Sequence, residues 1–107
     1  MAAQTVYLFV QVRVKPGKFD QFIKLIEKHV AVMRLEDGLI ALDLYKDVAS
    51  GNICVWEVWR DRASWDLHMV NESSKAWQVV AADYVDGESI TVMDEIPKSY
   101  PNLVIIN

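Results

Sequence analysis

The sequence predicts a single α+β domain, and three observations support this prediction. Residues 6–14 alternate between small apolar and other side chains, residues 19–35 repeat apolar positions at helical spacing, and a second round of strand and helix patterns follows. A chain of 107 residues has the length of one hydrophobic core and is too short for two. We therefore expect one domain over residues 1–107, with its core at about 5–95 and a tail at 96–107.

The first strand is expected at Val6–Val14, because β-branched apolar residues occupy every second position there. One face of this strand would carry Val6, Leu8, Val10, Val12 and Val14. Tyr7 and Phe9 begin the other face, so the first half of the strand is apolar on both sides. Residues 15–18, with the sequence Lys-Pro-Gly-Lys, end the strand because proline cannot donate to the ladder and glycine permits a turn.

A helix and two further strands are expected next. The helical stripe comprises Phe19, Phe22, Ile23, Ile26, Val30 and Met33. The helix should end near residues 36–38, with Gly38 in the left-handed conformation that caps many helices. Strands are expected at 39–45 and 53–59, joined by a hairpin loop at 46–52. The strand at 53–59 is apolar except for Glu57, which indicates burial on both faces.

A second helix should begin after Asp61, a good N-cap residue. The pattern is interrupted near residues 71–74, with the sequence Asn-Glu-Ser-Ser, and then resumes through Trp77. We expect Asp86-Gly87 to turn the chain and residues 89–93 to form the fourth strand.

The order β-α-β-β-α-β is that of the ferredoxin-like motif, with a four-stranded antiparallel sheet and two helices on one face. Two helices cover only one face, so the face that carries Tyr7 and Phe9 would be left as a large apolar patch. A two-fold homodimer built on that face would cover it. The apolar tail at 103–106 would suit reaching onto the partner subunit.

Composition and charge narrow the classes of function. The chain is 52% hydrophobic and 24% charged, with a net charge of −4, which argues against binding to nucleic acid phosphates. No apolar run approaches the ~20 residues of a membrane helix, and the N-terminus lacks the basic segment of a signal peptide. Cys54 is the single cysteine and only two histidines occur, on different helices, so we expect no disulfide and no metal site. We expect a cytoplasmic protein.

Several segments together resemble one protein family. The first half of this family's domain is matched by residues 14–18, which precede a helix, and by residues 34–38, which precede residues 43–47. The second half is matched by Glu57-Val58-Trp59-Arg60-Asp61 and by His68, seven residues after Asp61. Over about residues 5–95 the chain is similar to the antibiotic biosynthesis monooxygenase domain. Family members often have a small residue, a second histidine and a phenylalanine where this chain has residues 71–74.

The resemblance implies a dimeric α+β barrel with a small-molecule pocket between the sheet and the helices of each subunit. It implies a monooxygenase that acts without a cofactor on a small aromatic substrate such as a phenol or quinol. An alternative is a non-catalytic dimer of the same fold that serves as a small-molecule-binding or regulatory protein. A further alternative, haem binding or degradation, requires an axial ligand and usually an asparagine on the first strand, which has none.

His68 is the candidate general base. Cofactor-free oxygenation requires removal of a proton from a hydroxyl group whose unperturbed pKa is ~10, and a histidine at a dry aromatic pocket can accept it. The alternative is a structural histidine on the helix face whose ring nitrogens form hydrogen bonds with the backbone or with solvent. The resemblance adds support to the catalytic interpretation, and both interpretations stay open.

Five further residues are candidates for substrate binding. Glu57 and Trp59 share one face of their strand, which we expect to point at the helices, with Trp59 as a pocket wall and Glu57 as a hydrogen-bonding anchor. The alternative for Glu57 is a buried structural carboxylate, and the alternative for Trp59 is packing in the core. Tyr45 and Trp77 could line the pocket or belong to the core, and Asn71 could bind a substrate oxygen or end a helix.

Overall fold

The computed structural model describes residues 4–96, which form four strands and three helices. In chain order they are β1 (Val6–Val14), α1 (Phe19–Met33), β2 (Leu39–Lys46), β3 (Ile53–Trp59), α2 (Arg62–Val70), α3 (Glu72–Ala81) and β4 (Val85–Met93).

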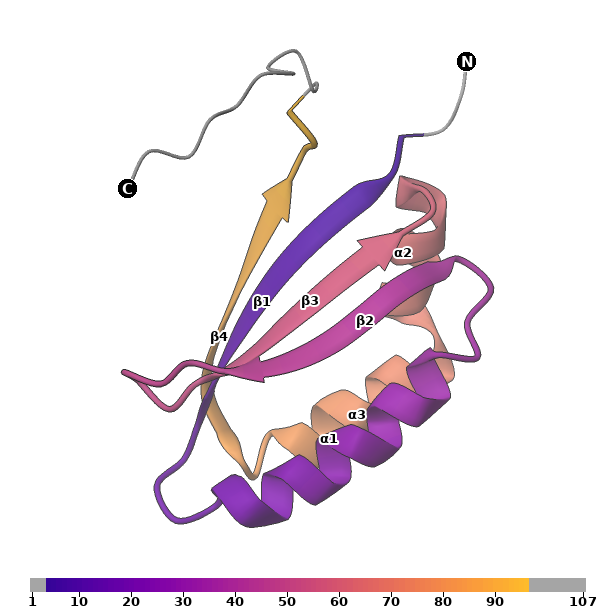
Figure 1. The fold of residues 1–107 in the computed structure, drawn as a ribbon. Helices are drawn as coiled ribbons and strands as arrows, with labels where there is room; N and C mark the ends of the chain where they lie inside the picture. The colour runs from indigo at the N-terminus through magenta and orange to yellow at the C-terminus, as the bar shows by residue number, and fades with distance from the viewer. Residues whose placement is uncertain (1–3, 97–107) are drawn as a thin grey trace, which may run out of the picture.

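The strands form one sheet in the order β2-β3-β1-β4, and each neighbouring pair is antiparallel. The helices gather on one side of this sheet, with α1 and α3 next to each other and α2 near the end of β3 (Figure 1). The α+β ferredoxin-like fold predicted from the sequence is therefore confirmed. Where two helices were predicted on this face there are three, because Asn71 has an extended backbone that separates α2 from α3.

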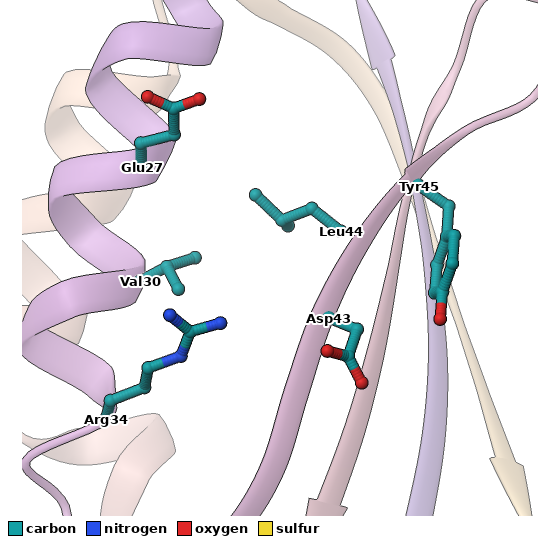
Figure 2. Close-up of a pocket in the computed structure, with 6 residues that line it drawn as sticks. All are labelled: Glu27, Val30, Arg34, Asp43, Leu44 and Tyr45. Carbon is teal, nitrogen blue, oxygen red and sulfur yellow. The ribbon is translucent and has the colours of Figure 1, made fainter.

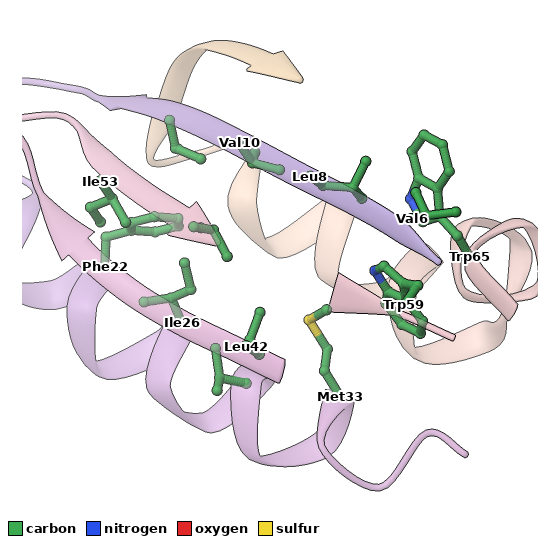
Figure 3. Packing of buried hydrophobic residues seen from close by; sticks show 13 residues of the cluster. Val6, Leu8, Val10, Phe22, Ile26, Met33, Leu42, Ile53, Trp59 and Trp65 are labelled. Atoms are coloured by element: carbon green, nitrogen blue, oxygen red, sulfur yellow. The ribbon is translucent and has the colours of Figure 1, made fainter. Parts of the chain in front are cut away.

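The core lies between the sheet and α1, α2 and α3. Antiparallel pairing places Leu8 opposite Glu57 and Val6 opposite Trp59, so these residues share the face that points at the helices. Leu8 is 1% exposed and Trp59 is fully buried. Figure 3 shows Trp59 and Leu8 close to Met33 of α1 within this cluster. The interpretation that Glu57 and Trp59 face the helices agrees with this register.

The backbone conformation of Gly38 differs from the one predicted. α1 ends at Met33, and the only positive φ angles among residues 4–96 are those of Gly17 and Gly51, so the left-handed cap predicted at Gly38 is wrong. A Cβ atom at Gly38 would instead clash with the side chain of Ser64 at the start of α2. Glycine is needed here because the residue just before β2 approaches the first turn of α2 closely.

The fourth strand is longer than predicted. Asp86 and Gly87 belong to β4, so the turn predicted at these two residues is wrong. Nε of Arg13 on β1 donates to Oδ1 of Asp86 at 2.7 Å, and the pairing of β1 with β4 shifts register between Arg13 and Val14. The ladder skips Asp86, since Arg13 pairs with Gly87 and Val14 pairs with Val85. A Cβ atom at Gly87 would lie 2.9 Å from the Arg13 guanidinium.

The outer face of the sheet carries aromatic side chains. Tyr7 and Phe9 are half-buried, as is Trp56, whose ring centroid lies 6.0 Å from that of Tyr7. Within residues 4–96 no helix covers this face (Figure 1). The apolar tail at 103–106, predicted to reach a partner, lies outside the described residues. None of the described helices is both long and apolar enough to cross a membrane, and the cytoplasmic location stays a prediction.

Candidate functional site

A cavity of about 560 Å³ lies between the helix-facing side of the sheet and the helices. Most of the side chains that line it are apolar. They include Leu8, Val10, Val12, Val55 and Ile90 from the sheet, and Phe22, Ile26, Val30, Met33, Trp65, Met69 and Trp77 from the helices. The polar lining groups are His29, Glu57, His68, Ser74, Gln78 and Glu88. An apolar cavity with a few converging polar groups is the usual form of a small-molecule site.

The burial of the lining residues shows where the cavity opens. Leu8 and Glu57, which pair across β1 and β3, are buried and form its closed end. Gln78, Glu88 and Ile90 line the same cavity but are exposed, and Ile90 retains 49% of its accessible surface. The cavity therefore opens between α3 and β4.

His68 lies at this cavity and is paired with a carboxylate. Its Nδ1 is 2.8 Å from Oε2 of Glu36, and the side chains of His68 and Glu36 are 14% and 19% exposed. A carboxylate can only accept, so Nδ1 of the neutral ring carries the proton and the lone pair lies on Nε2. The pair thus sets the tautomer in which Nε2 can accept a proton from a ligand.

Glu36 is itself held in place by the junction between α2 and α3. Asn71 Nδ2 donates to Glu36 Oε1 at 2.9 Å, so each carboxylate oxygen has a partner. Asn71 Oδ1 accepts from the backbone N–H of Ser74 at 2.8 Å and caps α3. Ser74 Oγ lies 3.3 Å from His68 Nδ1. The orientation of the His68 ring is therefore fixed by Glu36 and Ser74, and indirectly by Asn71, which holds Glu36.

Glu57 brings a carboxyl group to the closed end of the cavity. It is 8% exposed, and its Oε1 accepts a hydrogen bond from Trp59 Nε1 at 2.9 Å. Burial raises the pKa of Glu57 above its ordinary value, although the hydrogen bond from Trp59 opposes this rise. The Trp59 ring packs behind His68, with 4.8 Å between the ring centroids.

His29 of α1 forms part of the aromatic wall. Its ring stacks on Trp77 of α3 with 4.4 Å between centroids and 4° between planes. Burial, helped by the nearby His68, lowers the pKa of His29 from 6.5 to about 4. His29 is therefore neutral at pH 7 and contributes a flat, uncharged surface.

The structure brings together four of the six predicted site residues. His68, Glu57 and Trp77 line the cavity, and Trp59 supports His68 from behind. Asn71 does not line the cavity but binds Glu36 and caps α3, so it acts on the site through Glu36. The substrate-binding roles stay predictions.

Tyr45 is the residue that the structure places elsewhere. It pairs with Cys54 on the outer face of the sheet and is 60% exposed. Figure 2 shows Tyr45 projecting away from α1, at a separate pocket of about 350 Å³ that is also lined by Glu27 and Arg34. Tyr45 and His68 therefore do not share a cavity.

Sequence reasoning missed Glu36 as a functional residue. It lies in the loop after α1, where it resembles a helix terminator, and its partner is 32 positions away. The signal that could have found it is the family-like segment at 34–38, which precedes β2. Among residues 4–96, no three metal-binding side chains lie close enough together to hold a metal ion.

Comparisons with known proteins agree with this fold. Residues 5–80 match the family model of the antibiotic biosynthesis monooxygenases. A crystal structure of an antibiotic biosynthesis monooxygenase is 26% identical, with a TM-score of 0.78 over 86% of this chain and 99% of the other. PA3566 from Pseudomonas aeruginosa is 21% identical, with a TM-score of 0.80 over 90% of this chain and 98% of the other.

A sequence relative gives a partial match. The protein sll1783 of Synechocystis is 38% identical over 58 residues, which are 53% of this chain and 40% of the relative. This chain thus spans less than half of that relative. The family model, in contrast, covers most of the described domain, from β1 to the end of α3. The chain therefore belongs to the antibiotic biosynthesis monooxygenase family.

Proposed function

We propose that the protein is a monooxygenase that needs no cofactor and acts on a small phenol or quinol in the cavity between sheet and helices. The observation that supports this most directly is the His68–Glu36 pair at an apolar cavity with aromatic walls. The pair supplies a base, and the cavity supplies a dry place for an aromatic ring.

The chemistry follows from the pair. Nε2 of His68 accepts the proton of a ring hydroxyl, and Glu36 stabilises the imidazolium that forms. The resulting phenolate is electron-rich enough to reduce O₂ by one electron, and recombination at a ring carbon gives a peroxide. The attacked ring carbon still carries its one hydrogen, so the peroxide, once protonated, loses that hydrogen and its outer OH as water and leaves one oxygen atom on the carbon as a carbonyl. The substrate supplies all the electrons.

The test is oxygen uptake by the purified protein with a panel of quinols and without added metal. His68→Ala should lower kcat by roughly 10²- to 10⁴-fold, the range for losing a general base. The acidic limb of the pH–rate profile should disappear in the variant, because the group that must be deprotonated is gone. Circular dichroism should show that the variant remains folded. Unaltered turnover in His68→Ala would contradict the assignment.

A second candidate function is a binding or regulatory protein without catalysis. The observation that favours it is that Glu36, Asn71 and His68 also connect the loop after α1 to the junction of α2 and α3, which is a structural role. Binding of a quinol without oxygen uptake would select this function. An absorption spectrum distinguishes the haem-binding alternative, because bound haem gives a Soret band.

We also propose that the protein works as a homodimer built on the outer face of the sheet. Tyr7, Phe9 and Trp56 give this face an aromatic surface that the described helices do not cover. An apolar face of this kind is commonly buried between subunits. A two-fold pairing of sheets would bury it and leave each cavity on the far side.

A further inference from the structure

We infer that the cavity selects aromatic molecules that are neutral or positively charged and disfavours aromatic carboxylates, because the charged residue at its opening is Glu88. This inference rests on the proposed function and narrows its substrate class. It follows from the position of the charged groups that line the cavity.

Glu88 lies where a ligand would enter. It pairs with Val12 of β1, so its side chain is on the helix-facing side of β4. It is exposed and lines the cavity together with Gln78 of α3 and Ile90 of β4. Partial burial in the cavity wall raises the pKa of Glu88. An incoming anion would meet this carboxylate before it reached the aromatic wall.

Glu57 adds a second carboxyl group at the closed end. Its charge and that of Glu88 influence each other, since Glu88 is one of the groups that raise the pKa of Glu57. A ligand carboxylate would add a further negative charge in a space that solvates charge poorly. A ligand with ammonium or hydroxyl donors would instead give these groups a hydrogen-bonding partner.

No positive side chain balances these carboxyl groups. None of the residues that line the cavity is lysine or arginine among those that the structure describes. His29 is neutral at pH 7, and His68 is paired with Glu36. Lys15 Nζ donates to the carbonyl of Ala82, one of the lining residues, at 3.3 Å, but Lys15 itself does not line the cavity.

The inference is tested by calorimetric binding of three catechols that differ in one substituent. The probes are 4-methylcatechol, dopamine and 3,4-dihydroxyphenylacetate, which are neutral, cationic and anionic at pH 7. Titrations under nitrogen separate binding from turnover. Dopamine should bind at least about tenfold more tightly than the carboxylate, and this ratio should shrink at high salt because exposed charges are screened.

Two variants locate the effect. Glu88→Gln should reduce the ratio of the two affinities by about three- to tenfold, with dopamine binding more weakly and the carboxylate more tightly. Lys15→Gln, which removes a charge of the opposite sign next to the lining residue Ala82, should not reduce the preference for dopamine. Equal affinities for the two charged catechols, or a ratio unchanged by Glu88→Gln, would overturn the inference, as would binding of none of the three.

Failure of the predicted charge preference is distinguishable from failure of the monooxygenase proposal. If the charge preference is found but no catechol or quinol consumes oxygen, the monooxygenase proposal fails and the selectivity stands. If oxygen is consumed but the carboxylate binds as well as the amine, the selectivity fails and the proposed chemistry stands.

Discussion

His68 and Glu36 come from parts of the chain that are 32 positions apart, and their contact determines what the cavity can do. Without Glu36, the imidazole could carry its proton on either nitrogen. With it, the lone pair of the neutral ring lies on Nε2. In the proposed mechanism, Glu36 therefore affects catalysis without touching the substrate.

Glu36→Gln tests this positioning role. The amide can still accept from Asn71, but its NH₂ group would then face His68 and favour the tautomer whose proton is on Nε2. We expect kcat to fall by roughly 10- to 100-fold with little change in KM, because the ring no longer presents a lone pair to the ligand. Nitrogen NMR of the labelled histidine should report the change of tautomer.

Glu72→Gln is a suitable control for Glu36→Gln, since Glu72 lies next to the same junction in the first turn of α3. This control should keep both the tautomer and the turnover of the unmodified protein. A Glu36→Gln variant with full kcat would show that the carboxylate serves only to hold the fold.

His29 gives a prediction for the pH dependence of stability. Its pKa is about 4 in the folded protein and 6.5 ordinarily, so the unfolded chain binds the proton more readily between these values. The free energy of unfolding should therefore fall as pH falls from 6.5 towards 4. His29→Phe keeps a ring against Trp77 and removes the titration, so it should abolish up to roughly 3 kcal/mol of this loss.

The measurement is urea unfolding of both proteins at several pH values. Ionisation of Glu57 has the opposite effect. Because its pKa is raised in the folded protein, the free energy of unfolding falls as pH rises from the ordinary pKa of glutamate towards the raised one. Glu57 is present in both proteins and cancels in the difference. Parallel curves for the two proteins would show that His29 is not desolvated.

At the scale of helices and strands, Asn71 is the residue that divides the second helical segment. Its extended backbone ends α2 and its side chain caps α3. The same side chain reaches Glu36, so the break in the helix and the orientation of the His68–Glu36 pair depend on one residue.

Two substitutions at Asn71 separate these roles. Asn71→Ala should destabilise the protein by about 1–2 kcal/mol, because the cap is lost, and should also lower kcat. Asn71→Asp keeps an oxygen that can cap α3 but places a carboxylate beside Glu36, so kcat should fall while most of the cap energy is retained. Thermal unfolding and oxygen uptake measure the two effects. Equal loss of stability in both variants would contradict this separation.

Periodicity predicted the elements well because the pattern is local. The bounds of β1 and β3 agree with the prediction residue for residue, and Asp61 caps α2 as expected. The start of β4 was wrong because its partner Arg13 lies on the neighbouring strand β1, 73 positions before Asp86 in the chain. Gly38 was misread for a related reason: its neighbour Ser64 is 26 positions later in the chain. Both errors come from contacts that no local pattern contains.

The candidate site was predictable only in part. The strand register placed Glu57 and Trp59 on the helix side, and helical spacing brought His68 to the same cavity. Tyr45 was expected at the cavity with His68 but lies on the outer face, because its strand is at the edge of the sheet, where aromatic residues occur on either face. Glu36 required the fold itself, since only the packing of α2 brings it to His68.

At the scale of the whole molecule, the proposed dimer is the feature to test. Phe9→Arg places a charge in the centre of the outer face and should convert the dimer into a monomer, because an unpaired charge is costly to bury. Sedimentation at micromolar concentration measures the change. Val48→Arg, at a loop position that is 97% exposed, should leave the mass unchanged. A monomer before any substitution would refute the dimer.

The four tryptophans divide between the two faces of the sheet, and this makes the protein its own optical probe. Trp65 and Trp77 line the cavity and Trp59 lies behind His68, whereas Trp56 belongs to the outer face. In a Trp56→Phe variant, tryptophan emission would come only from the helix-facing side of the sheet. Occupancy of the cavity could then be followed without a label, and the difference in tryptophan emission between the unmodified protein and this variant would report association of the subunits.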